Sequence, residues 1–394
     1  MRDRTVLPKN SSRRDFLRTS LLAGTGAALV SSAAGESRAS EEPALIVRNS
    51  RPIDVETPVE VFDRFQTPNR LFFVRSHFGA PAVGLTRTWT LSIGGGVKTS
   101  RTFTIADLNA LESVKIPAVL QCAGNGRSLF SPTIPGVGWE KGAVGNAEWS
   151  GVRLGDLLRT VGIEPRMSHV HLHGADGPPA PKTPAYLRSL PLDRAMHSST
   201  IICTHMNGER LPVLHGGPLR LVVPGWAGNH WIKWLRSIVV AKDEAPGFYM
   251  QTGYKIPIRQ YPPGVDPKPS DLRPVTQLNI KSLIAHPSVG ATLDRGRVEV
   301  RGVAWTGGDA TVAKVEVSVA KPGALDSWAS AAFDAPAVPY AWRLWRFGFD
   351  GSQGPIAIKS RATDSTGNAQ PEVTPWNKSG YLWNGYDHVA CEVR

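Results

Sequence analysis

Hydrophobic and polar positions alternate with a period of two residues over much of the last third of the chain. The clearest runs are residues 298–301, 314–319 and 356–362. This alternation predicts half-buried β-strands, because successive side chains of a strand point to opposite faces of its sheet. Turn-forming residues at 306–309 and 364–368 separate the runs. The spacing is typical of a β-sandwich.

The first part of the chain has a different pattern. Between Arg70 and about Ala241, glycine turns separate short apolar runs, and helices are predicted at Leu154–Val161 and around Ile105–Leu111. This mixture indicates an α+β domain. Prolines crowd between Gly247 and Pro274 and indicate an irregular crossing segment. We therefore predict a leader at residues 1–39, a first domain at 40–274 and a second domain at 275–394.

The N-terminus carries the pattern of a twin-arginine signal peptide. Arg13 and Arg14 precede an apolar stretch of small residues from Leu21 to Ala34, and a cleavage site is expected after Ala34 or Ala39. The stretch is too short and too weakly apolar to predict a membrane span, and no later segment approaches the necessary length. Twin-arginine export carries folded chains, so the signal indicates a periplasmic protein that acquires a cofactor before export.

The charge of the chain favours anionic partners. The formal net charge is +12; residues 1–39 carry seven Lys/Arg and three Asp/Glu, which leaves +8 on the rest. A moderately basic surface attracts small anions and acidic proteins. No dense basic run is interleaved with aromatic residues, so a nucleic-acid partner is not expected.

The three cysteines, Cys122, Cys203 and Cys391, form no C-x-x-C pair. Zinc ribbons, cysteine-ligated iron–sulfur clusters and c-type haem attachment are therefore excluded. Cys203 lies in an apolar strand-like run and is predicted to belong to the core, unpaired with Cys391.

Cys122 lies in a loop of small residues. Gly124 and Gly126 permit a close approach of a ligand or a positive φ, and Arg127 supplies a cation that favours an ionised sulfur. A thiolate suits a soft or high-valent metal. The residues alone leave three interpretations open: a metal ligand, a catalytic nucleophile without an identified base, and a buried structural cysteine.

Two other groups of cations are candidates for anion binding. Arg75 and His77 are two positions apart at the end of an apolar strand-like run, Leu71–Val74, so both are expected on one face. His215, Arg220 and Lys233 adjoin glycine turns, a combination that suits a phosphate.

His169, His171 and His173 alternate along one predicted strand and share a face. Three imidazoles spaced in this way are able to bind zinc or copper. The alternative, which we favour, is a partly solvated strand face.

Several of these motifs resemble the sulfite oxidase family of molybdenum enzymes. The matching stretches are residues 73–77, 121–127, 222–225 and 233–235, and the resemblance extends from about Phe72 to the C-terminus. It implies one pyranopterin (molybdopterin) per molybdenum, oxidation of sulfite to sulfate, and an immunoglobulin-like C-terminal domain that forms a homodimer. The segments 342–345 and 375–377 match the pattern of that domain.

The resemblance also implies roles for particular residues. Cys122 is the implied ligand of molybdenum. The implied substrate pocket contains Arg75, Arg127, Trp139 and Arg301. The implied cofactor contacts are Phe73, Val74, Arg75, Ser76, His77, Asp176, His215, Arg220, Trp231, Ile232 and Lys233.

One position departs from the family pattern. Thr204 stands two residues before Met206-Asn207-Gly208, where the resemblance implies a catalytic tyrosine. A missing phenol puts sulfite in doubt as the substrate and leaves two alternatives, a sulfane-sulfur dehydrogenase subunit and a reductase of sulfoxides or other oxo compounds. Since the chain has no haem or iron–sulfur ligation, a separate c-type cytochrome is the expected electron acceptor. A cofactor-free binding protein is disfavoured by the export signal and the Cys122 loop.

Overall fold

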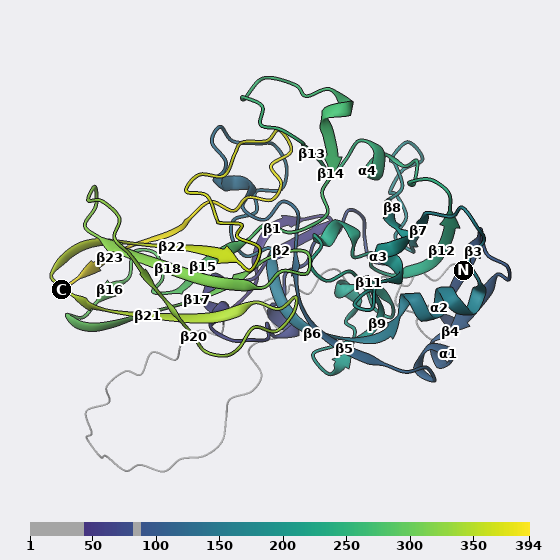
Figure 1. The fold of residues 1–394 in the computed structure, drawn as a ribbon, viewed down its shortest axis with the longest axis horizontal. Helices are drawn as coiled ribbons and strands as arrows, with labels where there is room; N and C mark the ends of the chain where they lie inside the picture. The colour runs from purple at the N-terminus through teal and green to yellow at the C-terminus, as the bar shows by residue number, and fades with distance from the viewer. Residues whose placement is uncertain (1–42, 82–87) are drawn as a thin grey trace, which may run out of the picture. The chain divides into compact units, whose positions relative to one another are not determined.

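Two five-stranded sheets form the first part of the structure, a computed structural model that describes residues 43–81 and 88–394 (Figure 1). The predicted twin-arginine signal lies outside the described residues. One sheet is antiparallel, in the order β10-β9-β6-β5 with β11 on β9. The other has the order β4-β3-β12-β7-β8, in which only β12 and β3 run parallel. The strands of the first sheet are β5 (Val114–Gln121), β6 (Val144–Arg153), β9 (Ile201–Met206), β10 (Glu209–Arg210) and β11 (Arg220–Val222), and those of the second are β3 (Thr90–Gly95), β4 (Arg101–Thr104), β7 (His169–Gly174), β8 (Leu187–Pro191) and β12 (Leu235–Ala241).

The helices of the described residues are short. The predicted helix at Leu154–Val161 is present with the same bounds as α2, because Leu154, Leu157, Leu158 and Val161 recur at helical spacing and are all buried. The second predicted helix is α1 (Ile105–Asn109), which Thr104 and Asp107 begin with a capping box. The others are α3 (Leu192–Met196) and α4 (Phe248–Gln251), with 3₁₀ turns that include Val59–Asp63 and Asn69–Leu71.

The predicted strand at Leu71–Val74 is absent. Leu71 ends a 3₁₀ turn, and the extended residues after it form a single bridge, Val55 to Val74, with β2 (Ile53–Glu56). The apolar run is buried on all sides rather than in a ladder: Phe72 is fully buried. Its hydrophobicity therefore reflects burial and not strand pairing. β2 also pairs with β1 (Ile46–Ser50).

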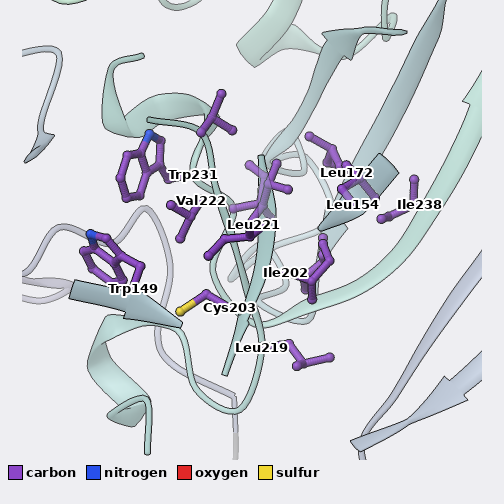
Figure 2. Packing of buried hydrophobic residues seen from close by; sticks show 14 of the residues in the cluster. Trp149, Leu154, Leu172, Ile202, Cys203, Leu219, Leu221, Val222, Trp231 and Ile238 are labelled. Carbon is purple, nitrogen blue, oxygen red and sulfur yellow. The ribbon is translucent and has the colours of Figure 1, made fainter. Parts of the chain in front are cut away.

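The core of the first part lies around strands β6, β9 and β11. Trp149, Cys203, Leu221 and Val222 belong to one buried cluster, part of which is drawn in Figure 2. Burial raises the pKa of the Cys203 thiol to about 12. Cys203 is therefore a core residue, as predicted, and the three cysteines are free.

The C-terminal part is a β-sandwich, as predicted (Figure 1). A four-stranded sheet has the order β15-β17-β21-β20, and a five-stranded sheet has the order β16-β23-β22-β18-β19. A buried apolar cluster contains residues of both sheets, among them Val300, Trp345, Val317 and Ile358. The strands are β15 (Lys281–His286), β16 (Thr292–Leu293), β17 (Gly296–Trp305), β18 (Val312–Ala320), β19 (Trp328–Ser330), β20 (Ala332–Phe333), β21 (Arg343–Gly351), β22 (Gly354–Asp364) and β23 (Asp387–Val393).

The proline-rich segment between the two parts is held by a two-stranded pairing of β13 (Lys255–Pro257) with β14 (Leu272–Pro274). The sandwich also contacts the Cys122 loop directly. Trp305 of β17 donates a hydrogen bond from Nε1 to Oε1 of Gln121, 2.7 Å away, and both groups are buried. The second part of the chain therefore helps to fix the loop that begins at Cys122.

Candidate active site

Two adjoining cavities share Arg75, His77, Cys122 and Tyr254 in their walls. The first, here called the lysine cavity, also contains Lys233. The second, the tyrosine cavity, also contains Tyr249 and Tyr381. Every residue that the sequence assigned to the cofactor lines the lysine cavity: Phe73, Val74, Arg75, Ser76, His77, Asp176, His215, Arg220, Trp231, Ile232 and Lys233. Arg127 and Trp139 line the tyrosine cavity. The roles of these residues remain predictions.

Cys122 follows directly after β5 and is 8% exposed. Its N–H donates to the carbonyl of Ala143 (2.9 Å), and its carbonyl accepts from the N–H of Asn125 (3.0 Å), which closes the loop into a turn. Burial raises the pKa of the Cys122 thiol, and the positive charges of Arg75 and Arg127 oppose that rise. Metal coordination would remove the proton, because a coordinating thiol ionises.

A glycine is required at position 126 of this loop. Gly126 has a φ of +87°, and a Cβ there would lie 2.8 Å from the side chain of Trp383. Any larger residue would strain the backbone and collide with the sandwich part of the chain. The glycine thus allows the two parts to close against each other at the thiol.

Arg75 is held by a buried carboxylate. Its Nη1 lies 3.2 Å from Oδ1 of Asp54, whose side chain is fully buried. Burial alone would lower the pKa of the Arg75 guanidinium, but Tyr254 and Asp54 raise it above its ordinary value. Arg75 therefore stays charged in both cavities, with part of its charge compensated.

His77 lies among aromatic rings. The hydroxyl of Tyr254 and Nε2 of His77 share a 2.9 Å hydrogen bond, and the ring of Tyr186 stacks on the imidazole at 4.2 Å between centroids. Burial lowers the pKa of His77 well below its ordinary value, and the charge of Arg75 lowers it further. Burial raises the pKa of Tyr254 well above its ordinary value. The hydrogen bond therefore joins two neutral groups.

The lysine cavity concentrates positive charge. Arg220 is 3% exposed and donates from Nη1 to the carbonyl of His215 (2.7 Å) and from Nη2 to that of Trp231 (3.1 Å). Its Nε has no acceptor within the described part of the chain. Lys233 donates from Nζ to Oγ of Ser76 (2.6 Å). Burial, and then the charge of Arg220, lower the pKa of Lys233 to about 7. A bound anion would restore the charge of this lysine.

Asp176 lies in the same cavity. Burial raises the pKa of its carboxyl group to about 6, and the nearby Lys233 opposes that rise. Near neutral pH a small change in the environment of Asp176 or Lys233 therefore changes its protonation state. A carboxyl group such as that of Asp176 suits the polar edge of a heteroaromatic ligand, and an amine such as that of Lys233 suits an anionic tail.

Three glycines shape the space around Arg127. A Cβ at Gly124, Gly136 or Gly380 would lie between 2.5 and 2.9 Å from atoms of the Arg127 side chain. The guanidinium lies over the ring of Tyr381 at 5.2 Å, and its contacts with backbone carbonyls are long, at 3.4 and 3.5 Å. The chain thus positions this cation closely while leaving its hydrogen-bonding capacity largely unused.

The structure corrects the placement of Arg301. Its side chain is 40% exposed, lies 3.5 Å from Asp63 and 3.6 Å from Glu299, and does not line either cavity. Alternation along β17 predicts that Arg301 shares a face with Glu299, but it does not say what that face contacts. Of the three arginines expected around the substrate, the structure brings two together.

The threonine at position 204 does not leave the cavities without a phenol. The hydroxyl of Thr204 bonds to Nδ1 of the adjacent His205 (2.9 Å), and Thr204 lines neither cavity. Tyr254 supplies a phenol to both cavities, and Tyr186 and Tyr381 supply one each. No local motif marks these tyrosines, which come from separate stretches of the chain.

The histidine face of β7 is tied to the neighbouring backbone. Nε2 of His171 lies 2.8 Å from the carbonyl of Asp243, and Nδ1 of His169 lies 2.8 Å from Oγ of Ser168. Across residues 43–81 and 88–394 there is no group of three or more His, Cys, Asp or Glu side chains arranged to hold a metal. The described geometry therefore provides no support for a second metal at this strand.

Comparison with known protein families agrees with this architecture. Residues 77–249 match the oxidoreductase molybdopterin binding domain, and residues 273–394 match the Mo-co oxidoreductase dimerisation domain. The fold and the two cavities therefore define a molybdopterin-type oxidoreductase.

Two similar proteins narrow the class of oxidoreductase. The chain is 34% identical over 369 residues to mitochondrial sulfite oxidase of Drosophila melanogaster, with 88% of this chain and 62% of the relative covered. It is 32% identical over 392 residues to sulfite oxidase of Arabidopsis thaliana, with 91% and 98% covered. The chain belongs to the sulfite oxidase family. It spans less than two thirds of the length of the animal mitochondrial relatives, since it covers 66% of the human protein.

A solved structure has the same fold over almost the whole chain. The sulfane dehydrogenase SoxCD from Paracoccus pantotrophus superposes with a TM-score of 0.77 at 25% identity, with 93% of this chain and 96% of that chain covered. The predicted order of a molybdopterin-binding part followed by a sandwich is therefore confirmed. Among the residues that the structure describes, no helix has the length and apolar character needed to cross a bilayer.

The residues of the lysine cavity fit a molybdopterin cofactor. The buried thiol of Cys122 is a soft ligand for the metal. Arg220, with an unused Nε–H, and Lys233, which lacks a full counter-charge, suit the phosphate. His77, Asp176 and His215 supply polar groups along the same wall.

Proposed function

We propose that this protein oxidises sulfite to sulfate in the periplasm and passes the electrons, one at a time, to a separate c-type cytochrome. The observation that carries the proposal is the position of Cys122, which lies in the wall that the lysine cavity and the tyrosine cavity share. A metal held by this thiol would face a cofactor on one side and a substrate on the other. Family membership supports the chemistry.

In this proposal the residues that line the lysine cavity hold one pyranopterin for each molybdenum, and the metal supplies two-electron redox chemistry at sulfur. Lys233 and Arg220 hold the phosphate, which raises the pKa of Lys233 again and keeps it charged. His77, in its neutral state, contacts the ring system. Cys122 provides the protein ligand of the metal.

The tyrosine cavity binds the oxyanion. Arg75 and Arg127 attract the negative charge, and Arg127 has free N–H groups to donate. Trp139 is 1% exposed and closes the wall against water. Tyr254 lies in both cavities and holds a proton that it shares with His77. It is the group placed to hydrogen-bond an oxygen of the substrate.

The homodimer is part of the proposal and rests on the match of residues 273–394 to a dimerisation domain. The periplasmic location rests on Arg13 and Arg14. Replacing both arginines by lysine should retain the protein in the cytoplasm. Export of that variant at the normal level would refute the location.

The test of the activity is sulfite-dependent reduction of cytochrome c by the exported, purified protein, measured together with its molybdenum content. We expect turnover that scales with molybdenum and approaches one metal per chain. Arg127→Leu should raise the KM for sulfite by about tenfold or more, since a charged hydrogen bond is lost. Protein fully loaded with metal but inert toward sulfite would refute the proposal.

The likeness to SoxCD favours a second candidate, oxidation of a sulfane sulfur. Both candidates use the same cavities, and they differ in the size of the substrate. A thiosulfonate probe offered in the same assay separates them. Turnover of that probe without turnover of sulfite would establish the second candidate.

A further inference from the structure

The tyrosine cavity is larger than sulfite requires. Its volume is about 350 Å³. Sulfite has the bulk of roughly two or three water molecules at about 30 Å³ each, about a quarter of that space. The cavity lies within the size range of sites for organic ligands, which begins at about 300 Å³. Even with the part nearest Cys122 given to a metal, room for a substituent remains.

Beside its arginines, the tyrosine cavity has an aromatic wall. Tyr254 and Tyr381 stack with 5.2 Å between ring centroids and an angle of 12°, and Tyr249 meets Phe248 edge to face at 5.2 Å. Phe248 lines the cavity and is 47% exposed. Aromatic rings arranged in this way favour an arene, which packs by stacking or by its edge.

The charge of the cavity suits a single negative charge. Arg75 is paired with Asp54, and Arg301 lies outside the cavity, beside Asp63. Arg127 has no carboxylate partner in the described part of the chain and makes only long contacts with carbonyls. One cation is thus left without compensation, and it matches a monoanion better than the sulfite dianion.

We propose that the tyrosine cavity accepts an aromatic sulfinate, with the sulfinate group at Arg127 and the arene against Phe248, Tyr249 and Tyr381. This inference rests on the proposed function, since a sulfinate keeps the sulfur lone pair that sulfite offers. The reaction is R–SO₂⁻ + H₂O → R–SO₃⁻ + 2 H⁺ + 2 e⁻. One S–O bond forms, both O–H bonds of water break, and a one-electron acceptor of the cytochrome c type takes the electrons in turn.

The test uses the exported, metal-loaded protein and matched pairs of probes. Turnover is measured with benzenesulfinate and methanesulfinate, and binding is measured by calorimetry with benzenesulfonate and methanesulfonate, which cannot be oxidised in this way. We expect the phenyl compound of each pair to be preferred by about tenfold or more. Phe248→Ala should reduce that preference several-fold, because an aromatic contact is lost. Ile258→Ala, at a 64% exposed apolar position that does not line the cavity, should leave it unchanged.

The outcomes separate this inference from the proposed function. Sulfite turnover without a phenyl preference in binding or oxidation would overturn the inference and leave the proposed function intact. A phenyl preference in binding that Phe248→Ala reduces, in protein inert toward sulfite, would support the arene site and refute the proposed function. Equal binding of both sulfonates overturns the arene site whatever sulfite does.

Discussion

Lys281 provides a test of the packing between the two parts of the chain. Its side chain is 1% exposed, its Nζ has no hydrogen-bond partner in the described residues, and it lies over the rings of Trp305 (5.8 Å) and Trp383 (4.6 Å). Trp305 holds Gln121, and Trp383 packs on the loop glycine beyond it. A buried, unpaired cation therefore adjoins the residues that fix the thiol.

Replacing Lys281 by methionine should stabilise the protein at pH 6. Burial lowers the pKa of Lys281 from 10.5 to about 7. At about 1.36 kcal/mol for each pH unit, this lowering costs the charged form roughly 5 kcal/mol. Loss of the two ring contacts removes about 2 kcal/mol of stabilisation, so the free energy of unfolding should rise by about 3 kcal/mol in the variant. Asp387 keeps Lys141 as a partner at 2.5 Å, so the variant leaves no unpaired carboxylate.

The pH dependence distinguishes this cause from better packing. Below about pH 7 the lysine is charged in the folded and the unfolded states, so the full cost applies. Between pH 7 and 10.5 the folded state releases the proton that the unfolded state keeps, so the stability of the wild type rises with pH. The advantage of Lys281→Met should therefore be largest at pH 6 and close to zero at pH 9.5.

Thermal unfolding of both proteins at the two pH values is the assay. A gain of about 3 kcal/mol predicts a midpoint roughly 3–6 °C higher for the variant at pH 6, given the size of the chain. Lys321→Met, at an exposed position, is the matched control and should show no such difference. An equal gain at pH 6 and pH 9.5, or no gain at either, would refute the reasoning.

Three further substitutions test the cavities. Gly124→Ala places a Cβ 2.9 Å from Nη2 of Arg127 and should raise the KM for sulfite by about tenfold. Gly138→Ala, which has open space around it, should leave the KM unchanged. Equal KM values for the two variants would contradict the role of Gly124 in positioning Arg127. Tyr254→Phe should lower kcat by about 10- to 100-fold with little loss of stability, and an unchanged kcat would remove the phenol from the proposal. Arg301→Gln should leave the KM for sulfite unchanged, and a large increase would restore the arginine to the substrate site.

Much of the fold could be predicted from local pattern. The helix Leu154–Val161 and the strands around residues 298–301, 314–319 and 356–362 lie where periodicity placed them, because each buries one face. The run before Arg75 was misread as a strand, since hydrophobicity alone does not distinguish a buried irregular segment from a buried strand.

The candidate site was only partly accessible to sequence reasoning. Residues in contiguous motifs, such as Ser76 and Lys233, were predicted to share one site, and the structure brings them into one cavity. Tyr186, Tyr254 and Tyr381 were missed because the wall they form depends on contacts between distant segments, including the chain after β22. The error at Arg301 has the same origin: its partner Asp63 is remote in sequence and lies in a 3₁₀ turn.

The central claim is that Cys122 holds a molybdenum cofactor between the two cavities. Its most direct test is the molybdenum and pterin content of the exported Cys122→Ser variant, measured beside wild type and Cys203→Ser. We predict that molybdenum falls at least about tenfold in Cys122→Ser, because a thiolate ligand is lost, and stays near the wild-type level in Cys203→Ser, whose thiol lies in the core away from both cavities. Equal molybdenum in Cys122→Ser and wild type would contradict the account.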